Sequence, residues 1–285
     1  MKLCIIGCNG QLGKDMVLCA RAQGHRVECM DFPSIDIANA RSVLDAVSPT
    51  SPDVIINCAA YTAVDACETD VDKAYAVNAT GVANIAKAAQ QVGAKCVHIS
   101  TDYVFDGTKK GPYVETDAPN PVSVYGKSKL AGEQELVRTW ENHFIVRIAW
   151  LYGTKGKNFL KTIRSLAEKS AVTKAPVKVV NDQVGTPTYT VHVCRQILTL
   201  METDRFGLYH STNEGWCSWF DFAKAIVKAY GIPAEIQPCT TAEFPRPAPR
   251  PANSVLENER LKKIGLNIMP RWENGLKEYL EEERK

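Results

Sequence analysis

The sequence lacks long hydrophobic runs and blocks of like charge, and these absences exclude several classes of protein. The apolar run at residues 3–6 is four residues long, too short for an export signal or for a membrane helix, which needs about 20 residues. Lysine and arginine total 34 and acidic residues total 32, and both kinds are dispersed, unlike a nucleic-acid or membrane surface. We therefore expect a cytoplasmic protein that binds neither nucleic acid nor membrane.

Metal-binding and disulfide patterns are also missing, although the chain contains ten cysteines. No C-x-x-C occurs, and the five histidines show no ligand spacing near the cysteines. Several cysteines stand in apolar runs typical of strands or helices. We interpret them as reduced core thiols, which agrees with a cytoplasmic location.

What is present is an ordinary globular composition, with 45% hydrophobic and 23% charged residues over 285 positions. A chain of this length can bury a large core, and we expect two lobes of unequal size. No internal repeat and no low-complexity tail interrupts it.

β-Branched apolar runs alternate with helical patterns through the first half of the chain. The first strand is predicted at residues 2–6 and the first helix at residues 11–22. This α/β alternation, with nearly continuous apolar strands, indicates a doubly wound parallel sheet of the Rossmann type, covered on both faces. Further strands are predicted at 26–30, 53–57, 95–100 and 144–148, and further helices at 40–47, 81–92 and 123–142.

The alternation fails after Trp150, which predicts a smaller C-terminal α+β lobe that binds substrate. Residues 1–150 then form a dinucleotide-binding domain, joined by a returning segment near 187–212, while 151–186 and 213–285 form the lobe. We expect the proline-rich segment 245–251 to be rigid and extended along the substrate side. Helices are predicted at 155–171, 191–203, 219–230, 258–263 and 272–282, and strands at 177–180 and 207–210.

A glycine-rich segment follows the first strand and opens the first helix. Gly7, Gly10 and Gly13 enclose Gln11 and Leu12 in the spacing G-x-x-G-x-x-G, one residue longer than the usual dinucleotide fingerprint. Glycine allows a tight turn and a close approach of backbone to pyrophosphate, and the helix N-terminus attracts phosphate. A plain glycine turn is the alternative, but the strand before and the helix after favour binding of NADH or NADPH.

Acidic residues follow the second predicted strand. Asp31 stands where a carboxylate binds the adenosine ribose and would repel a 2′-phosphate, so NADH should be tolerated or preferred. A solvated loop aspartate is the alternative. Asp36 and Ile37 form a second candidate, placed to bind the adenine.

The third predicted strand is followed by Ala60, Tyr61 and Thr62. Small residues at this point allow the cofactor to lie against the backbone, so we expect this loop to line its site. Thr62 and Val64 are predicted to face the cleft where substrate meets nicotinamide. The alternative is that these residues only pack against the neighbouring strands, and this alternative is stronger for Cys58 than for Thr62.

Tyr125 and Lys129 lie four residues apart on the predicted helix 123–142, so their side chains share one face. An ammonium group beside a phenol favours the phenolate and lowers the phenol's pKa from about 10. The tyrosine can then donate and accept a proton in catalysis. Such pairs are common on amphipathic helices, but this one follows a strand that ends in Ser100 and Thr101, which strengthens the catalytic interpretation.

Together these motifs resemble the dTDP-4-dehydrorhamnose reductase family of the extended short-chain dehydrogenase/reductase superfamily. The resemblance runs essentially end to end and includes the glycine motif. Any one segment is unspecific, but the set is specific. The matching segments are 57–65 (NCAAYTAVD), 100–107 (STDYVFDG), 120–133 (NPVSVYGKSKLAGE), 147–153 (RIAWLYG), 182–190 (DQVGTPTYT), 207–219 (GLYHSTNEGWCSW) and 248–252 (APRPA).

The resemblance implies roles at the reaction centre. Tyr125 would protonate the oxygen of a sugar C4 ketone as hydride arrives, and Lys129 would hold the nicotinamide ribose and lower the pKa of Tyr125. Thr101 would hydrogen-bond the carbonyl oxygen and stabilise its developing charge. Asp102 and Tyr103 would line the same rim.

The resemblance also implies contacts to the substrate. Trp150 is similar to the family's substrate-contact tryptophan at the end of the fifth strand, and a core tryptophan is the alternative. Asn158 and Arg250 are candidates for contacts to the substrate's diphosphate or nucleobase. An arginine among prolines offers a preorganised fork for phosphate.

One departure from related dehydratases bears on the reaction. Those enzymes are expected to carry Asp-Glu where this chain has Asp102-Tyr103, because elimination of water needs an added acid and base. Ketone reduction is therefore favoured over dehydration. Some family members dimerise through carboxylate-bound magnesium, but no acidic residue follows 187–190 where that ligand is expected, so we predict no metal and a monomer or a homodimer.

We therefore expect an oxidoreductase that uses NADPH or NADH to reduce the C4 ketone of dTDP-4-dehydro-L-rhamnose to dTDP-L-rhamnose, in polysaccharide biosynthesis. Reduction or epimerisation of another nucleotide-linked keto sugar is an alternative, since pocket shape sets substrate choice. A non-catalytic regulatory subunit of the methionine adenosyltransferase type, which resembles this family, is a third. Intact Thr101, Tyr125 and Lys129 argue for an enzyme.

Overall fold

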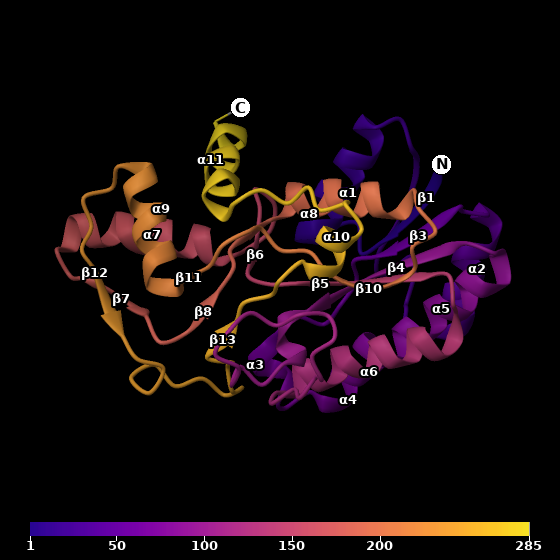
Figure 1. Ribbon diagram of the computed structural model, residues 1–285, viewed down its shortest axis with the longest axis horizontal. Coiled ribbons are helices and arrows are strands. Elements are labelled where there is room, and N and C mark those ends of the chain that lie inside the picture. The colour runs from indigo at the N-terminus through magenta and orange to yellow at the C-terminus, as the bar shows by residue number, and fades with distance from the viewer. Residues whose placement is uncertain (285) are drawn as a thin grey trace.

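The computed structural model describes residues 1–284 and is organised around one six-stranded sheet (Figure 1). All neighbouring strands in it run parallel, in the order β10-β5-β4-β3-β1-β2. The chain thus runs outward from β1 to β2 and then reverses to add β3 on the other side of β1. The strands are β1 (Lys2–Ile6), β2 (Arg26–Met30), β3 (Val54–Asn57), β4 (Lys95–Thr101), β5 (His143–Ile148) and β10 (Gly207–His210).

Helices cover both faces of this sheet. One face carries α1 (Gln11–Ala22) and α8 (Thr190–Met201), and the other carries α2 (Ala40–Val47), α5 (Gly81–Val92) and α6 (Val124–Thr139) (Figure 1).

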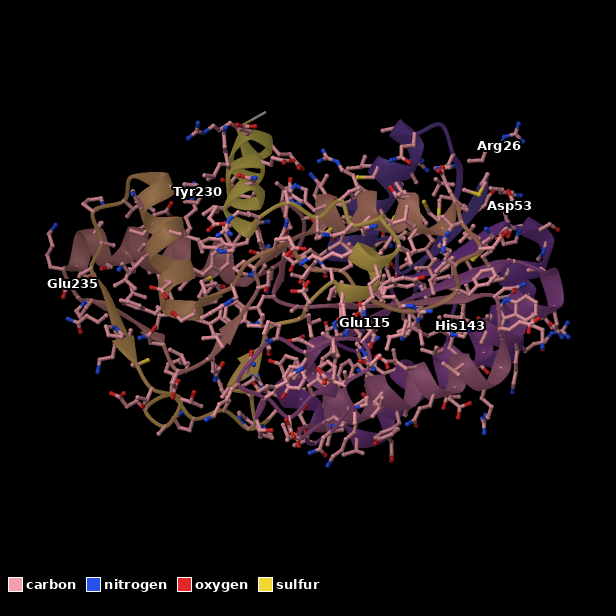
Figure 2. The ribbon with its side chains drawn as sticks, viewed as in Figure 1. Arg26, Asp53, Glu115, His143, Tyr230 and Glu235 are labelled. Atoms are coloured by element: carbon pink, nitrogen blue, oxygen red, sulfur yellow. The ribbon has the colours of Figure 1, made fainter. Side chains whose placement is uncertain are left out.

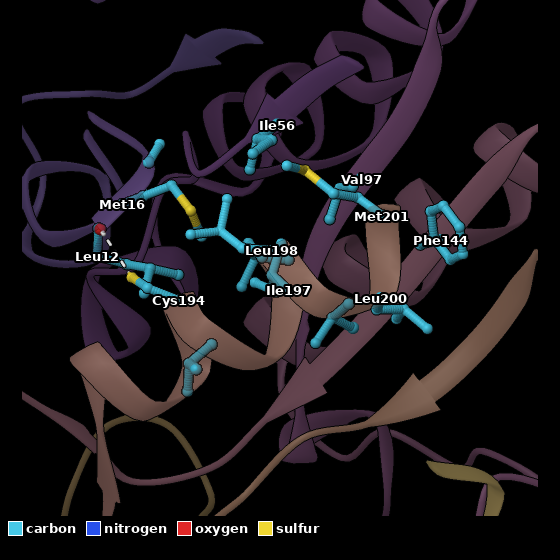
Figure 3. Close-up of a cluster of buried hydrophobic side chains, with 14 of the residues drawn as sticks. Leu12, Met16, Ile56, Val97, Phe144, Cys194, Ile197, Leu198, Leu200 and Met201 are labelled. Atoms are coloured by element: carbon cyan, nitrogen blue, oxygen red, sulfur yellow. Dashed lines mark hydrogen bonds between the residues drawn. The ribbon is translucent and has the colours of Figure 1, made fainter. Parts of the chain in front are cut away.

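Successive strand residues point to opposite faces, which divides the core into two clusters. Leu3 and Ile5 of β1 are buried with α1 and α8, whereas Cys4 and Ile6 are buried with α2 and α5. Figure 3 shows the first cluster, where side chains of α1 and α8 meet residues of β3, β4 and β5. The doubly wound parallel sheet predicted from the apolar strands is confirmed.

The carboxyl ends of the strands point toward the C-terminal half of the chain. Figure 2 labels Arg26, Asp53 and His143, which mark the amino ends of β2, β3 and β5, at the opposite end of the molecule from Tyr230 and Glu235. Ligands of open α/β sheets bind outside the carboxyl ends, where the strand order reverses. In this molecule that place lies between β1 and β3.

Beyond the sheet, the chain builds a lobe from three helices and short strands (Figure 1). The helices are α7 (Phe159–Thr173), α9 (Trp219–Tyr230) and α11 (Trp272–Glu283), and residues such as Phe222 and Tyr279 form their shared hydrophobic core. A fourth helix, α10 (Glu259–Lys263), packs against the main sheet through Leu261 instead.

The strands outside the main sheet pair in three small groups. β11 (Cys217–Ser218), β8 (Val184–Gly185) and β13 (Asn253–Ser254) form one sheet, β12 (Ile236–Cys239) and β7 (Val177–Val180) form a second, and β6 (Leu151–Tyr152) and β9 (Thr188–Tyr189) form a third.

The segment between β4 and α6 is fastened to the C-terminal segment. The amide of Tyr113 donates to the carbonyl of Val255, and the amide of Glu257 donates to the carbonyl of Tyr113, both at 2.8 Å. Glu115, near the middle of the molecule in Figure 2, accepts hydrogen bonds from the amides of His210 and Arg260 at 3.0 and 3.2 Å. These bonds hold the C-terminal segment beside the turn that follows β4.

Most predicted elements are confirmed to within three residues at each end, including the returning strand, which is β10 and runs parallel to β5. The predicted helix at 155–171 is wrong at its start, because Asn158 caps it and α7 begins at Phe159. Five elements of one or two turns are not predicted, since they are shorter than the window that a periodicity argument needs. These are α3 (Val64–Cys67), α4 (Val71–Tyr75), the π-helical η2 (Ala76–Thr80) and the 3₁₀ turns η1 (Ser48–Thr50) and η3 (Asp102–Val104). Over residues 1–284, no helix combines the length and the apolar character that crossing a membrane requires.

Candidate active site

The glycine loop joins β1 to α1 at the carboxyl edge of the sheet, and its backbone requires two of the glycines. Gly7 has a φ of +80°, and a Cβ there would lie 2.6 Å from the amide nitrogen of Ala59. A Cβ on Gly13 would lie 2.1 Å from the carbonyl oxygen of Gly7. Gly10 precedes α1 and provides no side-chain cap, so the first-turn amides of α1 stay available to a phosphate.

A cavity of about 500 Å³ opens beside this loop, within the usual size range of a ligand site. Six of the residues predicted to bind the cofactor line it, namely Gly7, Gly10, Asp31, Asp36, Ile37 and Ala60. Lys73 and Phe32 line it too, although neither belongs to a motif that predicts cofactor binding. Phe32 is 75% exposed, which is unusual for a large apolar ring.

The carboxylate of Asp31 closes the glycine loop. Its Oδ2 accepts a hydrogen bond from the amide of Asn9 at 2.7 Å, and its Oδ1 accepts one from the amide of Phe32 at 2.8 Å. Each carboxylate oxygen can accept a second bond, so the ribose contact stays a prediction. Asp36 is similarly bonded, because its Oδ1 accepts from the amide of Ala38 at 3.0 Å.

Gln11 and Leu12, at the start of α1, are placed in different ways. The side chain of Leu12 is buried in the core against α8, so only its backbone can face a cofactor. The side chain of Gln11 accepts a hydrogen bond from Asn158 at 2.9 Å and donates to the carbonyl of Leu151 at 3.3 Å. It therefore links α1 to the segment that follows β5.

The loop after β3 holds Tyr61 firmly and leaves Thr62 exposed. The amide of Tyr61 donates to Asn78 Oδ1 at 2.8 Å, and its hydroxyl donates to Asp70 at 2.7 Å. The ammonium group of Lys73 lies 4.7 Å from the centre of the Tyr61 ring. The loop is thus anchored to η2 and α4, both of which the sequence pattern misses.

Tyr125 lies in the first turn of α6, packed against the turn that follows β4. The helix begins after Ser123, whose Oγ accepts a hydrogen bond from the amide of Gly126 at 3.1 Å. A Cβ on Gly126 would lie 2.1 Å from the carbonyl oxygen of Tyr103, so glycine allows this close packing. The rings of Tyr103 and Tyr125 meet edge to face with centroids 5.5 Å apart, and Val64 packs in the same cluster.

Thr101 and Asp102 stand at the carboxyl end of β4, and both are buried. The Thr101 hydroxyl donates to Asp102 Oδ1 at 2.8 Å and accepts from the amide of Tyr103 at 3.2 Å. Burial raises the pKa of the Asp102 carboxyl to about 6. The structure thus brings together Thr101, Asp102, Tyr103 and Tyr125, as the resemblance implies.

The expected lowering of the Tyr125 pKa is wrong as a net effect in this arrangement. Burial, together with the Asp102 carboxylate, raises the pKa of Tyr125 above its usual value. Lys129 Nζ donates to the carbonyl of Ile99 at 2.7 Å, and burial lowers the pKa of its ammonium group to about 8. At neutral pH the phenol is therefore protonated, the form that a proton donor needs.

A buried ion pair anchors α6 to the sheet one turn beyond Lys129. The carboxylate of Glu133 accepts two hydrogen bonds from the guanidinium of Arg147 on β5, at 2.9 and 2.6 Å. The hydroxyl of Ser100 on β4 also donates to Glu133. Because the Glu133 and Arg147 side chains are only 6% and 3% exposed, this contact fixes the helix relative to both strands.

Trp150 follows β5 and lies between the sheet and the lobe. Its φ is +46°, and its ring stacks on that of Trp219 of α9 with centroids 3.4 Å apart. A Cβ on Gly185 would lie 2.3 Å from the ring. The tryptophan is half-buried, so it packs against the lobe and also keeps an open side, and a contact with substrate stays a prediction.

Asn158 and Arg250, the two candidates for diphosphate or nucleobase contacts, differ in how they are held. Asn158 caps α7 through its Oδ1, and its Nδ2 donates to Gln11 and to the carbonyl of Gly153, which gives it a structural task. Arg250 pairs with Asp65 at 2.8 Å and lies 5.9 Å from the centre of the Tyr103 ring. The guanidinium of Arg250 is therefore at the rim that Tyr103 forms.

Known proteins resemble this chain over its whole length. The family described as RmlD substrate binding domain matches residues 1–285. The chain is 40% identical over 282 residues to the spore coat polysaccharide biosynthesis protein SpsK of Bacillus subtilis, a match that covers 99% of this chain and 97% of that protein.

Solved structures with the same fold include two that cover nearly the whole chain. A dTDP-4-dehydrorhamnose reductase from Clostridium acetobutylicum is 45% identical and superposes with a TM-score of 0.96 over 100% of both chains. A dTDP-4-dehydrorhamnose reductase from Bacillus anthracis, in complex with NADP, is 40% identical and superposes with a TM-score of 0.94 over 99% of both chains.

Proposed function

Because this chain belongs to the RmlD substrate binding domain family, we propose that it reduces the C4 ketone of dTDP-4-dehydro-L-rhamnose to dTDP-L-rhamnose. As a member of that family it is an NAD(P)-dependent sugar-nucleotide reductase, and the proposal concerns the particular sugar. The observation that supports it most is the meeting of Thr101, Tyr103 and Tyr125 at the carboxyl edge of a sheet whose glycine loop opens on a cavity of about 500 Å³.

The residues of the glycine loop fit a nicotinamide dinucleotide. The positive φ of Gly7 and the uncapped start of α1 allow a pyrophosphate to approach backbone amides, and Asp31 stands at the end of β2 where a ribose would bind. NADPH or NADH would supply hydride to the C4 carbon of the sugar. Side chains of this protein would bind the substrate, stabilise the charge on its oxygen and transfer the proton.

In the proposed reaction, the substrate's ketone oxygen lies within reach of Thr101 and Tyr125. The Thr101 hydroxyl stabilises the negative charge that develops on that oxygen, and the Tyr125 phenol transfers its proton to it. Lys129 binds the nicotinamide ribose, and its positive charge favours the phenolate that remains after the transfer. Arg250 and Trp150 hold the nucleotide part of the substrate from the lobe side.

Oxidation of NADH and of NADPH, followed optically with the dTDP-4-keto sugar made in situ, tests the proposal. We expect turnover with at least one cofactor, dTDP-L-rhamnose as the product by NMR, and no effect of a metal chelator. Turnover with only a different nucleotide keto sugar would change the substrate and keep the reaction. No turnover with any keto sugar would favour a regulatory subunit. Light scattering would test the prediction of a monomer or a homodimer.

A further inference from the structure

His98 is a buried histidine that the proposed mechanism does not use. It stands in β4 and is 0% exposed, between Asn57 at the end of β3 and Lys129 on α6. Its Nδ1 lies 3.2 Å from Nδ2 of Asn57, and its Nε2 lies 3.4 Å from Nζ of Lys129. Three polar side chains from three elements thus form one buried row beneath the active site.

The hydrogen bonds of Asn57 determine which ring nitrogen of His98 carries the proton. Asn57 Oδ1 accepts from the amide of Ala59 at 3.0 Å, and a backbone amide can only donate, so Nδ2 must face the ring. Since Nδ2 also only donates, His98 Nδ1 must accept. A neutral imidazole that accepts at Nδ1 carries its proton at Nε2. Burial lowers the pKa of His98 well below its usual value, so the ring stays neutral.

The resulting Nε2–H group of His98 points at the amine of Lys129. An ammonium group has three donors and no lone pair, whereas a neutral amine can accept one hydrogen bond. Nζ already donates to the carbonyl of Ile99 at 2.7 Å, and both protonation states can make that bond. The contact with His98 therefore distinguishes the two states and favours the neutral amine.

The other ionisable groups near Lys129 act in the opposite direction. Glu133, on the same helix, and Cys58, after β3, both raise the pKa of Lys129 when they are charged. Burial raises the pKa of Cys58 to about 12, so its thiol is neutral at working pH and only Glu133 provides a negative charge. Burial of Lys129 outweighs it, and the pKa of the lysine is lowered to about 8.

We propose that His98 is a positioning residue for Lys129: the row from Asn57 to His98 holds an N–H donor against Nζ, keeps the amine beside the Ile99 carbonyl and favours the release of its proton. The lysine charge can then change near working pH instead of staying fixed. The kinetic part of this inference rests on the proposed function, whereas the tautomer of His98 does not.

Nitrogen-15 NMR of histidine-labelled protein tests the tautomer without any turnover. We expect one of the five histidine rings, assigned by its loss in His98→Gln, to carry its proton on Nε2. We also expect it to stay neutral down to about pH 6, where an ordinary histidine with a pKa near 6.5 is largely charged. A proton on Nδ1, or an imidazolium at that pH, would overturn the inference.

The pH profile of kcat/KM for ketone reduction tests the effect on Lys129. In the unmodified protein the rate should fall as the pH rises through about 8, because the lysine charge is lost above its pKa. Asn57→Asp keeps the acceptor for Ala59 and places an acceptor against His98 Nδ1. The ring proton then moves to Nδ1, Nε2 accepts from the ammonium group, and the alkaline limb moves to higher pH by about one unit or more.

Two further variants separate this effect from added charge and from general disturbance. Asn57→Leu removes the hydrogen-bond donor to His98 Nδ1 without adding a charge. The alkaline limb of the pH profile should then also move to higher pH, but by a smaller amount. His210→Gln changes another buried histidine, on β10, and should leave the limb in place. A folded Asn57→Asp variant with an unmoved limb would overturn the inference. Absence of turnover in the unmodified protein would reject the proposed function and leave the NMR result to decide the tautomer.

Discussion

The main sheet and the C-terminal lobe are built by different rules. In the sheet, neighbouring strands pair over four to six residues, and the connections from β1 through β5 contain helices that the chain forms locally. In the lobe, β8 and β13 pair over two residues that lie about 70 positions apart in the chain. The longer strands and helices of the sheet region carry clear sequence patterns, whereas the two-residue pairings of the lobe do not.

The candidate catalytic residues lie in the sheet region, whereas candidate substrate-binding residues lie toward the lobe. Thr101, Tyr125 and Lys129 are on β4 and α6 of the sheet region and are buried. Arg250 and Trp150, candidates for substrate contacts, lie outside these two elements: Arg250 reaches Tyr103 from the proline-rich segment, and Trp150 stacks on Trp219 of the lobe. The residues predicted to carry out the reaction therefore lie on a strand and a helix, which hold fixed distances. The residues predicted to contact the substrate lie in loop segments, and loops generally tolerate changes of sequence better than strands and helices do.

The sharpest test of this division is Tyr125→Phe, which removes one hydroxyl from the sheet side. We expect kcat to fall by about two orders of magnitude or more, the usual range for loss of an acid–base group, with an unchanged dissociation constant for the cofactor. Steady-state kinetics and fluorescence titration measure the two quantities. Tyr103→Phe, which changes the neighbouring ring, is the control and should lose much less. Near-normal turnover in Tyr125→Phe would remove this residue from the mechanism.

Glu133→Gln tests how strongly the buried ion pair holds α6 on the sheet. The change leaves the Arg147 charge buried beside a neutral group, and we expect the free energy of unfolding to fall by about 3 kcal/mol or more. Glu135→Gln, on the same helix, breaks the exposed pair with Arg138 and should cost less than about 1 kcal/mol. Urea unfolding of both variants measures the difference, and equal losses would contradict the anchoring role.

Arg250→Gln tests the lobe side. Loss of a charge-assisted hydrogen bond to the substrate should raise KM for the nucleotide sugar about tenfold, because such a bond contributes roughly 1.5 kcal/mol, with kcat and cofactor affinity nearly unchanged. Arg246→Gln is the matched control, since Arg246 lies in the same proline-rich segment but contacts Phe244. If both variants raise KM equally, the effect is one of overall charge and Arg250 has no specific contact.

The smallest expected effect is on cofactor choice. Asp31→Ala removes a carboxylate that would repel a 2′-phosphate, and the preference should move toward NADPH by roughly fivefold, from about 1 kcal/mol of charge repulsion near water. The ratio of kcat/KM for the two cofactors measures it. Asp36→Ala, which lies further along the same cavity wall, should move the ratio less. An unchanged ratio in Asp31→Ala would mean that Asp31 does not contact the ribose.

Much of the candidate site could be predicted because its residues adjoin elements with clear patterns. Gly7 and Gly13 stand between a strand and a helix, and Tyr125 and Lys129 have helical spacing. Residues that reach the site only through folding carry no such signal. Trp219 stacks on Trp150 from another element, and Lys73 enters the cavity from α4, a helix of five residues.

The protonation of the site also could not be predicted from spacing. Tyr125 and Lys129 share a helix face, but the pKa of each depends on how deeply it is buried and on which atoms face it. The lysine donates to the carbonyl of Ile99 and faces His98, and both belong to a strand about 30 positions earlier in the chain. Spacing brings the pair together without deciding its electrostatics.

The sequence by itself determined the parallel sheet, its covering helices and the cofactor end of the molecule, because apolar periodicity and glycine spacing act between near neighbours in the chain. Only the tertiary structure decided the pairings of the lobe, the stacking of Trp150 and the direction in which the pKa of Tyr125 shifts. Those depend on burial and on contacts across long loops, which no local pattern records.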